Sequence, residues 1–226
     1  MRHLKFKEID STNTYLKREY QNFDNLTFVS TSFQTNGHGR FSREWFAKED
    51  ESLLLSYLIK DRSLIDNFSY ISMFTAALIV KYLEDKGIKN VAIKWPNDIY
   101  VDGSKICGIL LEGEIPHYLV VGIGLNLNQS NFNNFNLRHP ATSLKMLSNG
   151  KNYSQEDETK SLINVINSFW DNFSNDWHVF DNFIKNHNYL KNMRVKVTNQ
   201  AIKIEGIVED IDSECNLLIN NGKEIV

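Results

Sequence analysis

The amino-acid sequence predicts an α+β fold followed by a small all-β module, and three observations lead to this prediction. Turns at Pro96 and at Asp102-Gly103 separate short apolar segments, a pattern typical of antiparallel strands. A long stretch with helical periodicity, residues 63–86, predicts a helix. After Lys191 the sequence changes to short strand-like segments joined by polar turns, so we expect a domain boundary near residue 190.

The elements expected before the central turns follow from local residue types. Ser11-Thr12-Asn13 favour helix caps, so a short helix should cover residues 14–20. Residues 26–33 alternate enough to predict a strand, whereas residues 34–45 are polar and contain glycine, as in a loop. Residues 53–59 are almost entirely apolar and predict a buried strand.

The remaining elements follow from the same rules. Strands are expected at 91–94 and 99–101, which form a hairpin, and at 118–125, whereas the asparagine-rich segment 126–136 should be irregular. Two further helices are expected at 154–175 and 177–190. These elements place a larger domain at residues 1–190 and a smaller one at 191–226, the latter with strands at 194–197, 202–208, 216–219 and 223–226.

The composition bounds the function. The chain has 226 residues, 42% of them hydrophobic, and a formal net charge of -3, so it lacks the basic excess expected of a protein that binds nucleic acid or an anionic membrane. Cys107 and Cys215 lie far apart in sequence, which argues against a zinc site and a disulfide framework; Cys107, within an apolar strand, is interpreted as a small buried filler. The N-terminus has no apolar signal-peptide region, and a cytoplasmic protein is expected.

Candidate chemistry begins at the run Lys94-Trp95-Pro96-Asn97-Asp98, which ends one apolar segment and starts the next. Lys105 follows the Asp-Gly turn, and we expect Lys94 and Lys105 to lie on neighbouring strands, where two ammonium groups can hold an anion. A hairpin that served packing alone would not need tryptophan, asparagine, aspartate and two lysines at its ends.

The loop at residues 34–45 is the second candidate. Gly37 and Gly39 permit positive φ and close approach of the backbone to a ligand, and successive amides there can form an anion-binding nest. Arg40 and Arg43 add two guanidinium groups suited to phosphate or carboxylate, and Trp45 offers a face for a base. Taken alone, the loop fits a flexible surface segment with chance charges about equally well.

The third candidate is the pair Gly122 and Gly124 inside an apolar strand. Glycine weakens a strand unless something lies close against its backbone. A flat ligand lying across the strand would explain both glycines, and so would tight packing of a helix.

Together these segments resemble the catalytic domain of biotin–protein ligases. The family's pattern is present, over roughly residues 8–145, as Ser11-Thr12-Asn13, the loop 37–45, the run 94–98, the segment 105–112 and the segment 122–128. The resemblance implies a mixed, mostly antiparallel sheet packed by helices, of the class II synthetase-like kind, and a small C-terminal SH3-like β-barrel.

The sequence also departs from the family's pattern. His38 stands where many members have arginine, and Ser42 replaces a glycine found in many relatives. The closing Gly-Glu strand is missing, so we expect an abbreviated C-terminal domain. Because the motifs begin at Ser11, the chain resembles the monofunctional type without an N-terminal DNA-binding domain.

The resemblance implies an ATP-dependent ligase with two half-reactions. Biotin is activated by MgATP as biotinyl-5′-AMP with release of pyrophosphate, and a lysine of a biotin carboxyl carrier protein domain then takes the biotinyl group and releases AMP. The implied cofactors are ATP and Mg²⁺, with biotin as substrate. No DNA or membrane partner is expected, and the protein should be a monomer or homodimer.

The site residues implied by the resemblance fall into groups. Arg40 and Lys105 should offset the charge at the reacting phosphorus, and the loop should close over the adenylate. Asp98 either orients Lys94 or Lys105 or helps hold Mg²⁺, and these alternatives stay open. Biotin should be bound by Ser11, Thr12, Asn13 and Gln34, the adenine or ribose by Trp45, Asn97 and Asn126, and the substrates more generally by Gly37, His38, Gly39, Arg43, Lys94, Gly108, Gly122 and Gly124.

Two alternative functions remain. A lipoate–protein ligase or octanoyl transferase also acylates a carrier lysine, but its Arg-Arg-x-Ser-Gly-Gly-Gly type of loop is absent here. A non-catalytic regulator that binds biotin or a nucleotide is disfavoured by the retention of Arg40 and Lys105.

Overall fold

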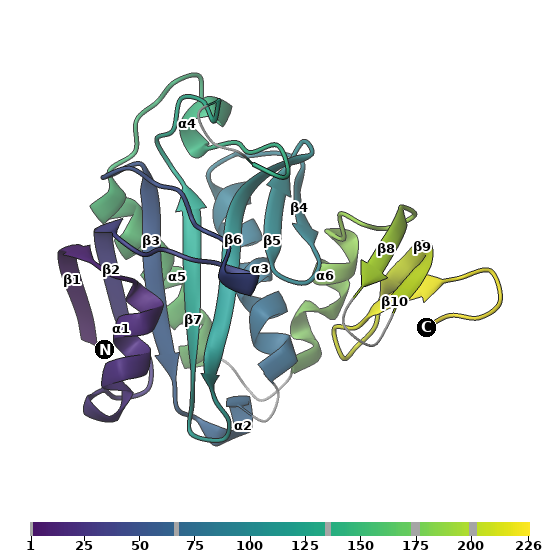
Figure 1. Cartoon of the computed structure of the whole chain (residues 1–226), viewed down its shortest axis with the longest axis horizontal. Helices are drawn as coiled ribbons and strands as arrows, with labels where there is room; N and C mark the ends of the chain where they lie inside the picture. Colours follow the sequence, from purple (N-terminus) through teal and green to yellow (C-terminus); the bar gives the residue numbers. More distant parts are fainter. Residues whose placement is uncertain (1, 66–67, 134–136, 173–176, 199–202) are drawn as a thin grey trace.

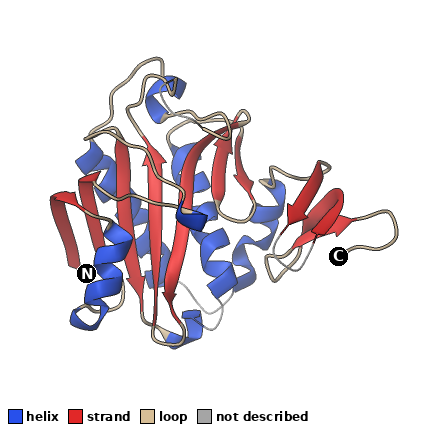
Figure 2. Ribbon diagram, viewed as in Figure 1, coloured by secondary structure: helices blue, strands red, loops and turns tan. Residues whose placement is uncertain are grey.

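The protein is described by a computed structural model that covers residues 2–65, 68–133, 137–172, 177–198 and 203–226. Its main feature is a seven-stranded sheet with strand order β1-β2-β3-β7-β6-β5-β4 (Figures 1 and 2). β1 and β2 run parallel and the other neighbours antiparallel, which confirms the mixed, mostly antiparallel sheet. The strands are β1 (Arg2–Ile9), β2 (Thr27–Gln34), β3 (Ser52–Ile59), β4 (Val91–Lys94), β5 (Asp98–Val101), β6 (Ser104–Glu114) and β7 (Tyr118–Asn126).

Helices cover both faces of this sheet. α1 (Thr12–Glu19) packs on one face, where Leu16 joins a small apolar cluster with Val29, Leu58 and Val120 (Figure 1). α3 (Phe68–Asp85) and α5 (Gln155–Asn172) lie on the other face, over the larger apolar core. β3 is buried along its whole length because it is covered from both sides. The remaining described α-helices are α2 (Arg62–Ile65), α4 (Leu144–Leu147) and α6 (Asp181–Asn186).

A second, three-stranded antiparallel sheet lies beside α6, on the side of the molecule away from β1 (Figure 1). It consists of β8 (Arg194–Thr198), β9 (Lys203–Ile211) and β10 (Leu217–Asn220), of which β9 is central. The strand expected at 223–226 is wrong, because only an isolated bridge joins Asn220 to Ile225. The domain boundary near residue 190 stays a prediction.

The described parts of the helix expected at 63–86 are helical, as α2 and α3, and residues 66–67 lie outside the described part of the chain. Another expected helix needs correction. The helix expected at 177–190 is a 3₁₀ turn followed by α6, which ends at Asn186. It stops there because residues 187–189 bond to β4 instead: the Ile93 amide donates to the His187 carbonyl at 2.7 Å, and the Tyr189 amide donates to the Ile93 carbonyl at 2.9 Å.

β1 was not predicted from the sequence. Charged and apolar side chains mix along residues 2–9, and the strand lies at the sheet edge, where it is partly exposed. Its pairing with β2 depends on a partner that follows 25 residues later at the register Arg2–Thr27, which no local pattern announces. The last residues of the helix expected at 154–175, residues 173–175, and the start of the strand expected at 202–208, Ile202, lie outside the described residues. Among the described residues, no helix combines the length and apolarity needed to cross a membrane.

Candidate active site

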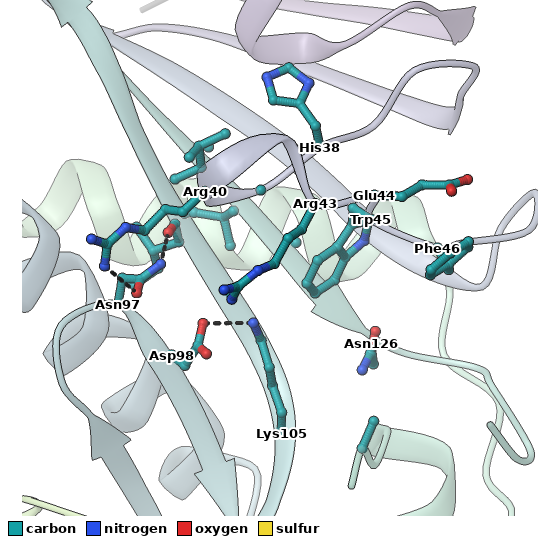
Figure 3. Close-up of a pocket in the computed structure, with 18 of the residues that line it drawn as sticks. His38, Arg40, Arg43, Glu44, Trp45, Phe46, Asn97, Asp98, Lys105 and Asn126 are labelled. Carbon is teal, nitrogen blue, oxygen red and sulfur yellow. Dashed lines mark hydrogen bonds and ion pairs between the residues drawn. The ribbon is translucent and has the colours of Figure 1, made fainter. Parts of the chain in front are cut away.

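A cavity of about 580 Å³ opens on the α1 face of the sheet. It lies between α1, the loop after β2, strands β6 and β7, and the turn that joins β4 to β5 (Figure 3). Apart from Gly37, every residue that the sequence analysis nominated lines this cavity, namely Ser11, Thr12, Asn13, Gln34, His38, Gly39, Arg40, Arg43, Trp45, Lys94, Asn97, Asp98, Lys105, Gly108, Gly122, Gly124 and Asn126.

One end of the cavity carries a buried polar network. Ser11 caps α1, since its side chain accepts a bond from the Thr14 amide, and the chain thereby places the next two side chains over the sheet. The Thr12 amide and hydroxyl both donate to Gln34 Oε1, at 2.8 and 3.0 Å. Ser56 of β3 is wholly buried, and its hydroxyl lies 2.7 Å from Thr12 Oγ1 and 2.6 Å from Asn13 Oδ1. These buried polar atoms are therefore held in fixed positions.

Two glycines form a flat floor in the middle of the cavity. Gly108 of β6 and Gly124 of β7 are direct partners in the sheet. A Cβ on Gly124 would lie 2.6 Å from the Trp45 ring, and one on Gly108 would lie 3.1 Å from the same ring. The indole therefore rests against bare backbone, and Gly122 in the same way accommodates Asn13. In this structure the glycines make room for side chains of the protein itself.

The loop before Trp45 closes on itself. The Gly39 amide donates to the Arg43 carbonyl at 2.7 Å, and the Trp45 amide donates to the Gly37 carbonyl at 3.0 Å, so these amides are not free to form an anion nest. Gly37 and Gly39 do not adopt the positive φ that glycine permits; the left-handed residue of the loop is Phe41, at φ 59°. The Phe41 ring is 78% exposed, and the Arg40 and Arg43 guanidinium carbons lie 5.3 and 5.4 Å from its centre.

The other end of the cavity is cationic. Lys105 Nζ lies 2.7 Å from Asp98 Oδ1, so Asp98 forms an ion pair with Lys105 (Figure 3). Lys94 Nζ instead donates to the Tyr100 hydroxyl at 3.1 Å. The two lysines are not on neighbouring strands, because β5 lies between β4 and β6. Burial lowers the pKa of Lys94 more than the Asp98 carboxylate raises it, and the positive charges of Lys105 and Arg138 lower it further.

Two asparagines that line the cavity form hydrogen bonds with neighbouring segments. Asn97 Nδ2 donates to the Ile109 carbonyl at 2.6 Å, and Arg40 donates to Asn97 Oδ1 at 3.4 Å, so the arginine of the loop reaches the turn between β4 and β5 (Figure 3). Asn126 is buried, and its Nδ2 donates to the Thr142 carbonyl at 3.0 Å. Both amides are thus anchored in the protein.

Some cavity residues were missed from the sequence. Arg138 and His139 line the cavity, although they fall just after the asparagine-rich segment 126–136, where no functional residue after Asn126 was expected. They are brought there because the Lys105 amide donates to the Pro140 carbonyl at 2.8 Å and the Thr142 amide to the Lys105 carbonyl at 2.9 Å. Burial, then the charges of Lys94 and Arg138, lower the pKa of His139. Nothing in the local pattern indicated this pairing.

Glu112 on β6 was also missed, although it stands in the motif that contains Lys105. Its carboxylate accepts hydrogen bonds from Lys17 Nζ, 2.5 Å from Oε1, and from Asn13 Nδ2, 2.9 Å from Oε2. His38 Nε2 lies 3.5 Å from Oε2. The available signal was the alternation of the strand, which puts Gly108, Glu112 and the cavity on one face.

The thiol of Cys107 fits the expected filler role. It is fully buried and free, and burial raises its pKa well above the usual range, which leaves it unreactive. Within the described part of the chain, no three histidine, cysteine or acidic side chains gather in the way a metal ion requires.

Glu112 makes the stability of the protein depend on pH. Burial alone would raise its pKa, but the hydrogen bonds from Lys17 and Asn13 and the charges of Lys17 and His38 outweigh burial and hold the pKa below its usual 4.5. A carboxyl with a lowered pKa in the folded state contributes stability above its usual pKa and loses it as the pH falls through the folded value. We therefore expect the difference in free energy of unfolding between the wild type and Glu112→Gln to shrink as the pH falls below about 4.5.

Urea unfolding at a series of pH values measures this difference. Glu114→Gln, on an exposed residue of the same strand, is the control and should differ little from the wild type throughout. A Glu112→Gln difference that stays constant down to the lowest pH would contradict the assignment of a stabilising carboxylate.

Comparison with known proteins gives a consistent result. The model of the biotin/lipoate A/B protein ligase family matches residues 5–126. The bifunctional ligase/repressor BirA of Bacillus spizizenii is 30% identical over 157 residues, which cover 66% of this chain and 48% of the relative. A biotin–[acetyl-CoA-carboxylase] ligase of Mycobacterium tuberculosis is 31% identical over 101 residues, which cover 43% of this chain and 38% of the relative. The chain thus spans about half the length of the first of these relatives.

The fold has a close counterpart among solved structures. The biotin protein ligase of Aquifex aeolicus, in complex with biotin and ATP, aligns with a TM-score of 0.88 and 26% identity, covering 100% of this chain and 94% of that one. The family match extends over more than half of the chain and includes α1, the loop and the strands that build the cavity. On this evidence the chain belongs to the biotin/lipoate A/B protein ligase family.

Proposed function

We propose that this protein is a biotin–protein ligase that activates biotin as biotinyl-5′-AMP and transfers it to a lysine of a biotin carboxyl carrier domain. The observation that carries the proposal is a single cavity surface with two unlike ends: the buried network of Thr12, Asn13 and Ser56, and the cationic end at Lys105. The Aquifex aeolicus protein, whose fold matches the whole of this chain and 94% of its own, was solved in complex with biotin and ATP.

The first half-reaction suits this arrangement. The biotin carboxylate attacks the α-phosphorus of ATP, and pyrophosphate leaves. Two anions must approach one another, so fixed positive groups are needed to offset their repulsion and the charge that develops on phosphorus. Lys105, oriented by Asp98, and Arg40, linked to Asn97, fill that role in the proposal. Gln34 and the α1 N-terminus bind the polar atoms of biotin.

The nucleotide is assigned to the floor made by Gly108 and Gly124. Trp45 rests on this floor, and its buried Nε1 finds no acceptor among the described residues, so an acceptor on the ligand would satisfy it. Mg²⁺ enters with the ATP phosphates. Asp98 is already paired with Lys105, so no side chain of this protein is assigned as a ligand of the ion.

The second half-reaction needs no nucleophile from this protein. The neutral amine of the carrier lysine attacks the carbonyl of the mixed anhydride and a C–N bond forms. The C–O bond breaks, AMP leaves with its electrons, and the nitrogen releases one proton to solvent. Until then the adenylate has to be kept from water, which is the function proposed for the loop at 37–45. The carrier partner, the absence of DNA binding, the monomeric or homodimeric state and the cytoplasmic location stay predictions.

Pyrophosphate release tests the proposal directly. With ATP and Mg²⁺, release should require biotin and should not be supported by lipoate or octanoate. Release with lipoate or octanoate alone would favour the related lipoate ligase or acyl transferase. Binding of biotin without any release, in the presence of a carrier domain, would favour a non-catalytic regulator.

Arg40→Gly should weaken retention of the adenylate far more than it weakens folding. Arg40 is exposed, and its contacts are the Phe41 ring and Asn97, so its loss removes part of the loop's closure and little packing. Free biotinyl-AMP should then label lysines on bystander proteins. The measurement is biotin incorporated into serum albumin, with Arg40→Lys as the charge-preserving control. Bystander labelling no greater than that of the wild type would contradict a role of Arg40 in retention.

A further inference from the structure

Glu112 lies next to the cavity and connects β6 to α1 and to the loop at 37–45, which are far from it in sequence. It is not one of the residues that line the cavity, yet its carboxylate contacts Asn13 and Lys17 of α1 and approaches His38 of the loop. Its side chain is 22% exposed, so a charge there is only partly hydrated. Removing a charged group from water costs free energy unless ion pairs and hydrogen bonds compensate, so the contacts of Glu112 are its main energetic compensation.

The contacts of Asn13 have a definite direction. Its Nδ2 has two hydrogens, and these face two acceptors: Glu112 Oε2 at 2.9 Å and the Leu110 carbonyl at 3.4 Å. Its Oδ1 faces the Ser56 hydroxyl at 2.6 Å, which can donate. An ionised carboxylate can only accept, so the reversed amide would bring Oδ1 against Glu112 and would lose this arrangement.

Packing holds the same side chain in place. Asn13 lies directly on Gly122 of β7, where a Cβ would come within 2.3 Å of Oδ1. Gly122 is the sheet partner of both Ser56 and Leu110, so the residues that hold the two ends of the amide lie on either side of that glycine. Packing against Gly122 thus sets the position of the Asn13 side chain, and the acceptors on β6 set the orientation of its amide.

We propose that Glu112 is a positioning residue for biotin recognition, which holds the Asn13 amide in one orientation so that its carbonyl oxygen is presented to the N–H groups of the ureido ring. This inference rests on the proposed function and extends it by a residue that does not itself line the cavity. Glu112 acts through Asn13 and makes no contact with the reacting atoms.

The neighbours of Glu112 keep it in the form that this role requires. Lys17 donates to Oε1, which leaves Oε2 for Asn13. His38 is the other titratable group facing the carboxylate, and it adds positive charge only when protonated. Because Lys17 and Asn13 hold the pKa of Glu112 below its usual range, the carboxylate is ionised at neutral pH.

The test is a double-mutant cycle on biotin binding, measured by calorimetry with the full chain and without ATP. Glu112→Gln keeps the shape of the side chain, but its amide can donate as well as accept, so Asn13 is no longer confined to one orientation. We expect the dissociation constant for biotin to rise about tenfold, as for the loss of one hydrogen bond to a charged group. In an Asn13→Ala background, Glu112→Gln should add less than about a twofold change, since the residue through which it acts is gone.

Kinetics supply a second readout. Glu112→Gln should raise KM for biotin and leave kcat for pyrophosphate release within about a factor of two, because the reacting groups are untouched. Glu114→Gln, two residues along the same face of β6 and exposed, is the matched control and should change neither value. If Glu112→Gln does not fold, Ser56→Ala, which removes the donor at the other end of the amide, should show the same dependence on Asn13.

The outcomes separate this inference from the proposed function. A wild-type protein that does not bind biotin would overturn the function itself. A wild type that binds biotin, with Glu112→Gln binding equally well, would overturn only the positioning role. Additive effects of Glu112→Gln and Asn13→Ala would overturn it too, because Glu112 would then act by a route other than Asn13.

Discussion

Lys105→Ala is expected to slow biotin-dependent pyrophosphate release about 10²–10³-fold while the protein stays folded, because the loss of one preorganised donor at a developing charge has an effect of this size. Lys105 Nζ is fixed by Asp98 and lies 5.6 Å from the centre of the Trp45 ring, at the boundary between the cationic end and the floor. Its side chain is 28% exposed, so its removal should leave the core intact.

Part of this loss should come from Asp98. Once Lys105 is gone, the carboxylate faces the cavity without its partner and repels the phosphates. The double variant Lys105→Ala/Asp98→Asn should therefore recover some of the rate. Lys105→Arg keeps the charge and should lose less than the alanine variant, and Lys81→Ala on the exposed side of α3 is the control for loss of a lysine elsewhere. Near-normal pyrophosphate release by Lys105→Ala would remove Lys105 from the mechanism.

Gly122→Ala is expected to weaken biotin binding strongly. The added Cβ would stand 2.3 Å from Asn13 Oδ1, so Asn13 must move away from the strand and from Ser56. Overpacking of this kind costs about 1–3 kcal/mol, which corresponds to roughly a 5- to 150-fold rise in the dissociation constant for biotin. Calorimetry with biotin measures the affinity, and urea unfolding measures how much of the strain appears as lost stability.

Alanine substitutions at two other glycines distinguish the effect of local strain on stability from the effect of losing a binding contact. A Cβ on Gly113 would meet the Tyr118 carbonyl at 2.3 Å, outside the cavity, so Gly113→Ala should lose stability without a matching loss of biotin affinity. A Cβ on Gly124 would meet the Trp45 ring at 2.6 Å, so Gly124→Ala should weaken ATP binding more than biotin binding. Unchanged biotin affinity in a folded Gly122→Ala protein would show that Asn13 is not needed where the structure places it.

Local chemistry made several parts of this structure predictable. Asp102 and Gly103 both have positive φ, as the Asp-Gly hairpin turn requires, and Pro96 lies between β4 and β5, where the ladder breaks. Ser11 caps α1 as its residue type indicates. Each of these features depends on residues within a few positions of one another, so the sequence contains the whole reason for it.

Other features could not be predicted because the deciding contact is remote. The side chains that lie against Gly122 and Gly124 are Asn13 and Trp45, which come from distant segments of the chain. The positive φ that Gly37 and Gly39 would permit is found instead at Phe41, because the loop folds back through hydrogen bonds of its own amides. Lys94 and Lys105 looked adjacent along the chain, but a whole strand lies between them in the sheet.

By itself, the sequence determined the turns and strands on either side of Pro96 and Asp102-Gly103, which family the chain resembles, and many of the side chains that line the cavity, because turn chemistry, periodicity and motif spacing are local. The tertiary structure alone decided that Asp98 pairs with Lys105 and that Glu112 reaches Asn13 across 99 residues. Those pairings depend on how β6 lies beside β5 and beneath α1. Strand order and helix placement come from burying the apolar faces of the whole domain, and no short stretch of sequence contains that information.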